Sequence, residues 1–172
     1  CGWHTAEHLC FKTNQRLNDL DLPLGALRFI SKVQRKIQEV IGPQPDFEVL
    51  DPLCRWSSGA TYDLRRGDGT DLANKMSSDI TVTPRCRKHL ERVMDDLWKD
   101  AAGDIVEVDG NRCVTVPKDA KIDRMIAAEP TGNAFLQQGV GRYIRRRLKA
   151  FGIDLNDQSV NQGLAFEAYL EH

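Results

Sequence analysis

The chain has 172 residues, a hydrophobic content of 41% and a net charge of −1 at pH 7. This length suits one compact domain with its own core, and the charge balance excludes a uniformly basic protein. Five cysteines at irregular spacing, with no signal peptide before them, argue against a secreted disulfide framework, and no apolar run is long enough to cross a bilayer. We therefore expect a cytoplasmic protein.

Both ends look like cuts in a longer chain. The first residue is Cys1 rather than Met, and no helix stop signal precedes the C-terminus. The closing Leu-Glu-His is either native or the start of an expression tag. We expect residues 1–172 to form a single partial domain.

The first ten residues contain Cys1, His4, His8 and Cys10, whose spacings are similar to those of zinc ligands. On a helix His4 and His8 share a face, but Cys10 lies well round from them. Four tetrahedral ligands rarely come from one ten-residue segment. We therefore expect a plain amphipathic helix here and assign no metal ligand.

Two further helices are indicated by apolar residues at helical spacing. One begins at Asp21 and Pro23 and is stopped by Gly42-Pro43, and the other begins at Thr83-Pro84 and ends near Gly103. About forty residues between them are rich in Pro, Gly, Ser and Asp. This stretch, with its segments 55–61 and 65–69, predicts loops that contact a ligand, and a mobile insertion is the alternative.

The C-terminal half predicts a small antiparallel sheet followed by helices. Residues 105–108 and 113–116 flank Asp109-Gly110-Asn111 and read as a β-hairpin, and residues 122–128 offer a third strand. A helix from about Asn133 to Ala150 follows, with Gly152 as a left-handed stop, and a shorter one covers about 159–169. The fold class is therefore α+β, mostly helical.

Positive charge is concentrated in one stretch. Residues 111–150 contain nine Lys or Arg and three acidic residues, a charge of +6, which leaves −7 for the rest of the chain. A polyanion is the natural partner for such a stretch.

Lys118, Lys121 and Arg124 lie close together on a short path in this stretch. A triphosphate requires several donors because its charge is spread over many oxygens, so the three cations form a candidate triphosphate clamp. The alternative is a solvated loop in which Asp119 and Asp123 pair with them locally.

A second basic cluster follows on the predicted helix. Arg142, Arg145, Arg146 and Lys149 fall on adjacent turns of one face, and Arg147 completes the run. Such a ridge suits a nucleic-acid backbone, although an exposed helix end stabilised by the helix dipole has the same composition. No phosphate-binding glycine loop, nucleophile elbow or zinc-protease motif occurs, so hydrolytic or redox chemistry has no visible residues.

The order of several segments resembles the replicase β subunits of positive-strand RNA bacteriophages of the Q-beta, or levivirus, type. The segments are EVDGNRCVTVPKDAKIDRMIAAEP, GVGRYIRRRLKAFGIDLNDQSVNQGLA and, upstream, WSSGAT and residues 78–84. The resemblance implies the fingers of a right-hand RNA-directed RNA polymerase. It implies that Lys118 and Lys121 hold the incoming nucleoside triphosphate and that Arg124 approaches its phosphates or its base.

The same resemblance implies that Arg142, Arg145, Arg146, Arg147 and Lys149 lie near template or product RNA. In this family the primer 3′ hydroxyl attacks the α-phosphate, and palm aspartates hold two Mg²⁺ or Mn²⁺ ions. The chain contains no Gly-Asp-Asp, so we assign no catalytic residue, expect palm and thumb downstream, and expect the chain alone to be inactive. The implied setting is the cytoplasm of an infected bacterium, with host translation proteins as partners and no membrane.

Two other functions use the same residues. A stand-alone RNA-binding module would use the basic stretch without any role for a nucleotide. A small structural protein would use the basic helix only to cap a bundle.

Overall fold

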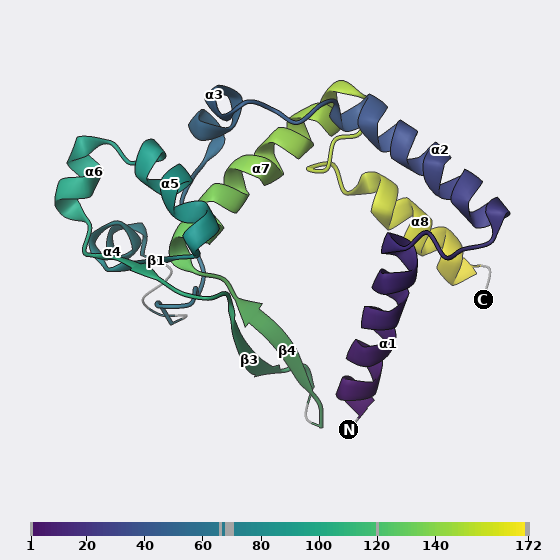
Figure 1. Ribbon diagram of the computed structural model, residues 1–172, viewed down its shortest axis with the longest axis horizontal. Helices are drawn as coiled ribbons and strands as arrows, with labels where there is room; N and C mark the ends of the chain where they lie inside the picture. The colour runs from purple at the N-terminus through teal and green to yellow at the C-terminus, as the bar shows by residue number, and fades with distance from the viewer. Residues whose placement is uncertain (1, 66, 68–70, 120, 171–172) are drawn as a thin grey trace. The chain divides into compact units, whose positions relative to one another are not determined.

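The computed structural model describes residues 2–65, 67, 71–119 and 121–170 (Figure 1). The chain divides into two compact units, residues 1–44 and 45–172. In the described residues, no helix is long and apolar enough to cross a membrane.

The N-terminal unit is a pair of helices, α1 (Gly2–Asn18) and α2 (Leu24–Ile41). Pro23 precedes the first turn of α2, and Gly42 ends the helix with a φ of 83°. The predicted start and stop of this helix are therefore confirmed. No described residue of this unit is buried.

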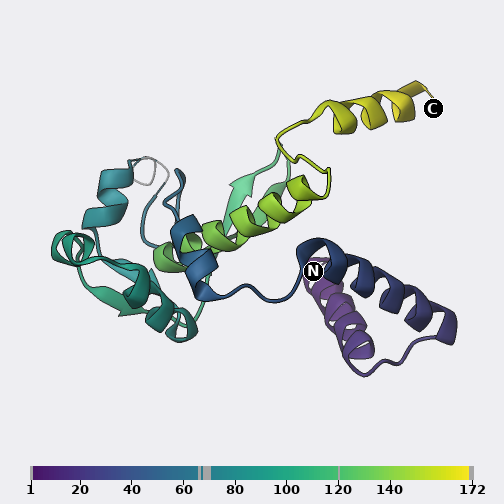
Figure 2. The ribbon, with the colours of Figure 1, turned by 90° about the horizontal axis from the view of Figure 1, so that it is seen from above.

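The C-terminal unit is built around the long helix α7 (Thr131–Ala150), which Figures 1 and 2 show in green. Its other helices and first strands, in chain order, are α3 (Phe47–Leu50), η1 (Asp51–Leu53), α4 (Leu72–Ser77), β1 (Ile80–Val82), α5 (Pro84–Val93), α6 (Asp96–Ala101) and β2 (Ile105–Glu107). Helix α7 contacts β1, η1, α5 and α3.

The core of this unit lies where the first half of α7 meets β1, α5 and α6. Its buried residues are Ile80, Val82, Leu90, Met94, Trp98 and Phe135. The rings of Trp98 and Phe135 have centroids 5.1 Å apart, and Trp56 packs on both at 5.1 and 4.8 Å. Burial of these large apolar surfaces is the main source of the unit's stability.

Two small sheets replace the single hairpin expected for residues 105–116. Strand β2 pairs in parallel with β1, whereas β3 (Arg112–Pro117) pairs antiparallel with β4 (Asp123–Ala128). The predicted turn at Asp109-Gly110 is therefore wrong as a hairpin turn. The chain reverses between β3 and β4 instead, and Asp119 Oδ1 there accepts hydrogen bonds from the backbone N–H groups of Lys121 (2.8 Å) and Ile122 (3.0 Å).

The helix predicted from Thr83-Pro84 to Gly103 is broken in two. Helix α5 ends at Val93, and Asp95 begins α6 by accepting a hydrogen bond from the Trp98 N–H at 2.7 Å. An aspartate at this position satisfies an N–H that has no carbonyl partner in the helix, and it therefore favours a new helix start over continuation.

Helix α7 starts two residues before the predicted Asn133 and ends as expected. Gly152 has a φ of 92°, its N–H donates to the Lys149 carbonyl, and the Ile153 N–H donates to the Leu148 carbonyl. This pair of bonds is a Schellman motif. The last predicted helix is confirmed as α8 (Ser159–Leu170), and the α+β class is confirmed as well.

Candidate functional site

The three cations of the candidate clamp lie at the end of the β3–β4 hairpin. Lys118 and Lys121 belong to the turn, and Arg124 lies in β4 opposite Val116. All three are exposed, and within the described part of the chain none of them makes an ion pair. Neither Asp119 nor Asp123 forms an ion pair with them among the described residues, and the carboxylate of Asp119 accepts hydrogen bonds from backbone N–H groups.

The hairpin register places Arg124 on the same sheet face as a cavity. The cross-strand pairs on that face are Arg112 with Ala128, Val114 with Ile126, and Val116 with Arg124. Residues alternate between the faces of a strand, so these six side chains project to one side. This face therefore runs from an arginine at the base of the hairpin to the cations at its turn.

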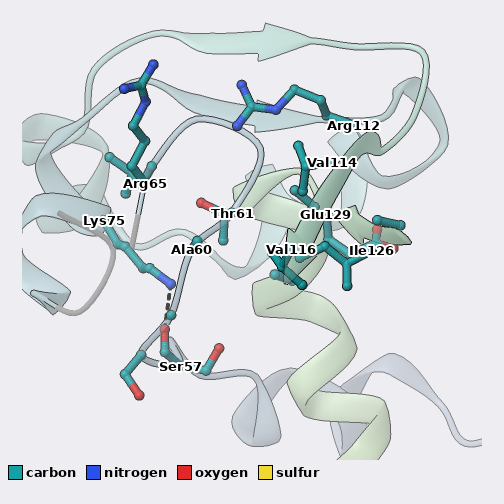
Figure 3. A pocket seen from close by; sticks show the side chains of 16 residues that line it. Ser57, Ala60, Thr61, Arg65, Lys75, Arg112, Val114, Val116, Ile126 and Glu129 are labelled. Atoms are coloured by element: carbon teal, nitrogen blue, oxygen red, sulfur yellow. Dashed lines mark hydrogen bonds between the residues drawn. The ribbon is translucent and has the colours of Figure 1, made fainter. Parts of the chain in front are cut away.

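The cavity has a volume of about 380 Å³ and separates this face from residues 57–61 (Figure 3). Val114, Val116 and Ile126 form its apolar wall. Its charged lining residues are Arg65, Lys75, Arg112 and Glu129. The cavity thus combines an apolar surface with an excess of positive charge.

Lys75 fixes the loop on the opposite side of the cavity. Its side chain comes from α4 and is only 2% exposed, and its Nζ donates to the Ser57 carbonyl at 2.6 Å. Burial lowers the pKa of Lys75, because a charged ammonium is less stable away from water. Lys75 therefore holds Ser57, at the start of residues 57–61, in place beside the cavity.

Hydroxyl groups join the same loop to the start of α7. The Thr131 hydroxyl donates to Asp63 Oδ2 at 2.5 Å and lies 2.7 Å from the Thr61 hydroxyl, which must then donate to it. The Thr81 hydroxyl accepts a hydrogen bond from the Thr131 N–H at 3.1 Å, and the Tyr62 N–H donates to the Glu129 carbonyl at 2.7 Å. These buried bonds hold the loop, β1 and α7 in one arrangement.

Sequence reasoning missed Arg65, Lys75 and Arg112 as parts of one cavity. Arg112 alternates with Val114 and Val116 in the printed sequence, which was a usable signal for a shared strand face. No signal marked Lys75, since lysine is almost never buried. Residues 55–61, expected to be a ligand-contacting loop, do line the cavity in part.

The structure separates the predicted RNA-binding residues on α7 into two groups. Arg142 is half-buried, and its Nη1 donates to the Leu53 carbonyl at 3.0 Å. Arg145, Arg146 and Lys149 line a small hollow of about 120 Å³, whereas the half-buried Arg147 is not among its lining residues. Lys149 pairs with Asp154 at 2.8 Å, and this hydrogen bond raises the pKa of Lys149 and lowers that of Asp154.

His4, His8 and Cys10 all lie on α1, while Cys1 lies outside the described residues. Among the described residues, no three His, Cys, Asp or Glu side chains are grouped so as to hold a metal ion.

Residues 3–171 match the model of a protein family described as RNA replicase, beta-chain. The chain therefore belongs to that family, which confirms the resemblance found in the sequence. It is 39% identical to the RNA-directed RNA polymerase subunit beta of Enterobacteria phage SP, over 96% of this chain and 30% of that protein. Against the Escherichia virus Qbeta subunit the identity is also 39%, over 94% of this chain and 28% of the relative.

A further relative is the RNA-directed RNA polymerase beta chain of Escherichia phage MS2. The two proteins are 44% identical over 65% of this chain and 22% of the relative. The chain thus spans less than a third of the length of these relatives.

Proposed function

We propose that this chain is the part of a viral RNA-directed RNA polymerase that binds the incoming nucleoside triphosphate and the template RNA. The observation that carries the proposal is the exposure of three cations at and beside the hairpin turn. In the described part of the chain, Lys118, Lys121 and Arg124 have no carboxylate partner there, although Asp119 lies between the two lysines. Cations left unpaired on a hydrogen-bonded hairpin are available to an anionic ligand.

The role of the turn follows from the chemistry of nucleotidyl transfer. Attack of a 3′ hydroxyl on the α-phosphate releases pyrophosphate, and negative charge builds on the leaving oxygens. Lys118 and Lys121 would hold those oxygens as point charges, and the planar guanidinium of Arg124 would bind two oxygens at once. The hairpin contributes by positioning the triphosphate and stabilising its charge before the reaction begins.

Arg145 and Arg146 are proposed to contact the RNA backbone. Both are exposed on α7 and flank the same small hollow as Lys149. Arg142 is proposed to support α7 against η1 through its bond to the Leu53 carbonyl, and not to bind RNA directly. Arg147 is half-buried and is proposed to have only a minor role in RNA binding.

The full subunit is proposed to act in the cytoplasm of an infected bacterium, with host translation proteins among its partners. The residues that hold the catalytic metal ions are proposed to lie in its palm, outside this chain. The purified chain should then show no primer extension with Mg²⁺ or Mn²⁺, and detectable extension would overturn this division of roles.

Nucleotide discrimination tests the proposal. A fluorescent ATP analogue bound to the chain should be displaced by ATP at concentrations about tenfold or more below those needed for AMP, because AMP lacks two phosphates. Changing Lys118, Lys121 and Arg124 together to Ala should abolish this preference.

The matched control changes Arg28, Lys32 and Arg35 of α2 to Ala. This variant removes the same charge from exposed positions of the other unit and should keep the preference for ATP. A chain that binds RNA with the expected salt dependence but never distinguishes ATP from AMP would instead be a plain RNA-binding module.

A further inference from the structure

We propose that Asp119 is a positioning residue for the triphosphate at the hairpin turn. Its carboxylate would fix the backbone that carries Lys121, while its negative charge would work against the bound ligand. This inference rests on the proposed function and assigns a role to the acidic residue that lies between the two lysines of the candidate clamp.

Two oxygen atoms hold the turn together. Asp119 Oδ1 accepts hydrogen bonds from the backbone N–H groups of Lys121 at 2.8 Å and Ile122 at 3.0 Å. The Ile122 carbonyl oxygen accepts hydrogen bonds from the N–H groups of Lys118 at 2.9 Å and Asp119 at 3.3 Å. One carboxylate oxygen and one carbonyl oxygen therefore bind the N–H groups of Lys118, Asp119, Lys121 and Ile122.

The side-chain bonds of Asp119 are the part of this arrangement that a substitution can remove. The bonds to the Ile122 carbonyl join backbone to backbone, so they do not depend on the Asp119 side chain. Without the two bonds to Oδ1, the N–H groups of Lys121 and Ile122 would bind water, and the backbone there would be freer to move. The cost of ordering it would then fall on the binding of the ligand.

An ordered turn favours a triphosphate because this ligand must meet several cations at once. The paired strands hold Arg124 opposite Val116, whereas Lys121 lies in the turn and depends on the bonds within it. A cation already in place loses less conformational freedom when the ligand binds. Loss of the Asp119 bonds should weaken the binding of ATP more than that of AMP, because AMP lacks the phosphates that require the whole set of cations.

The charge of Asp119 acts in the opposite direction. The residue is exposed, and among the described residues it makes no ion pair with Lys118, Lys121 or Arg124. A carboxylate beside a bound triphosphate is a like charge that repels it, although water and salt weaken the repulsion. Asparagine keeps an acceptor oxygen at this position and removes the charge, so the two effects of Asp119 can be separated.

The turn can be altered without disturbing the core. Strands β3 and β4 make their main contacts with each other, and among the described residues the buried core cluster includes none from these strands or their turn. A change in ATP binding should therefore occur without a change in the free energy of unfolding. This difference separates a positioning role from a purely structural one.

Displacement of a fluorescent ATP analogue from the 172-residue chain tests the proposal. Asp119→Ala should weaken ATP binding about threefold to tenfold and reduce the preference for ATP over AMP, because the turn loses two hydrogen bonds. Asp119→Asn should bind ATP at least as tightly as the unchanged chain. Asp109→Ala removes the same charge from an exposed position before β3, and this matched control should bind ATP like the unchanged chain. Urea denaturation should give similar midpoints for all four proteins.

Amide hydrogen exchange measured by NMR tests the turn without any ligand. In Asp119→Ala the N–H groups of Lys121 and Ile122 should exchange with solvent faster than in the unchanged chain, whereas in Asp119→Asn they should exchange at nearly the unchanged rate. Unchanged exchange in Asp119→Ala would mean that the two bonds do not order the turn in solution, and it would overturn the proposal.

The binding results also separate this inference from the proposed function. If Asp119→Ala and Asp119→Asn both bind ATP more tightly than the unchanged chain, Asp119 acts only through its charge and the inference is wrong. If both variants bind ATP like the unchanged chain, or both bind it equally weakly, the two hydrogen bonds do not position the ligand, and the inference is again wrong while the proposed function stands. If the unchanged chain does not prefer ATP to AMP, the proposed function itself fails, and this inference fails with it.

Discussion

Substituting Gly139 in the middle of α7 tests how this helix is seated. A Cβ added at Gly139 would lie 2.6 Å from Cys54 Sγ, 3.2 Å from the Leu50 carbonyl oxygen and 3.3 Å from the Cys54 nitrogen. The thiol is itself held 3.6 Å from the Leu50 carbonyl, so it has little room to move. Overpacking of this kind costs about 1–3 kcal/mol, which exceeds the gain of about 1 kcal/mol from replacing glycine by alanine in a helix.

Gly141 on the same helix is the matched control, because a Cβ there meets nothing within 4 Å. Gly139→Ala should therefore lower the free energy of unfolding by up to about 2 kcal/mol, whereas Gly141→Ala should raise it by about 0.5–1 kcal/mol. Urea denaturation followed by tryptophan fluorescence measures both, since Trp56 and Trp98 lie in and against the core.

A double variant identifies the atom responsible. Cys54→Ala removes Sγ, so Gly139→Ala should be less destabilising in that background, with a coupling energy of about 0.5 kcal/mol or more. Equal stability changes for Gly139→Ala and Gly141→Ala would refute the close approach of α7 to η1.

Three further predictions concern the supports of the cavity and core. Lys75→Met should show a pH-dependent stability difference, because the pKa of Lys75 in the folded chain is lower than its ordinary value of 10.5. The unfolded chain then binds more protons just below pH 10.5, so the unchanged chain should gain stability relative to Lys75→Met as the pH rises toward that value, and parallel stabilities in urea titrations would contradict this. Asn133→Ala removes the acceptor of the Thr83 N–H bond at 3.0 Å and should cost about 1–3 kcal/mol, whereas Asn133→Asp keeps an acceptor and should cost less in the same denaturation assay. Asp95→Ala should cost about 0.5–2 kcal/mol by removing the cap of α6, and an unchanged thermal midpoint would show that α6 does not depend on it.

Local signals predicted the helices better than the strand pairing. Pro23 with Gly42, and Gly152 after the basic run, correctly delimited α2 and the end of α7 because these residues act within one turn of the helix. The pairing of β2 was not predicted because its partner β1 lies 25 residues upstream, from Ile80 to Ile105. The turn residues Asp109-Gly110 suggested a hairpin between β2 and β3, whereas the hairpin that forms joins β3 to β4.

The site was predictable only where it depends on one short segment. Lys118 and Lys121 are exposed because they lie in the hairpin turn, and Arg124 is exposed beside the turn in β4. The cavity joins residues 57–65, Lys75 and the hairpin face, which are far apart in the chain, so its lining could not be read from spacing. The bond from Arg142 to the Leu53 carbonyl joins residues that lie 89 positions apart, so it could not be predicted from the spacing of the basic residues on the helix.

Photoaffinity labelling tests the central claim that the hairpin turn holds a triphosphate. ATP carrying a photoreactive group on its γ-phosphate should label peptides that contain residues 117–124, and unlabelled ATP should suppress the labelling far more effectively than AMP. Labelling of residues 145–149 instead, or labelling that ATP and AMP suppress equally, would contradict the assignment of the turn as a triphosphate clamp.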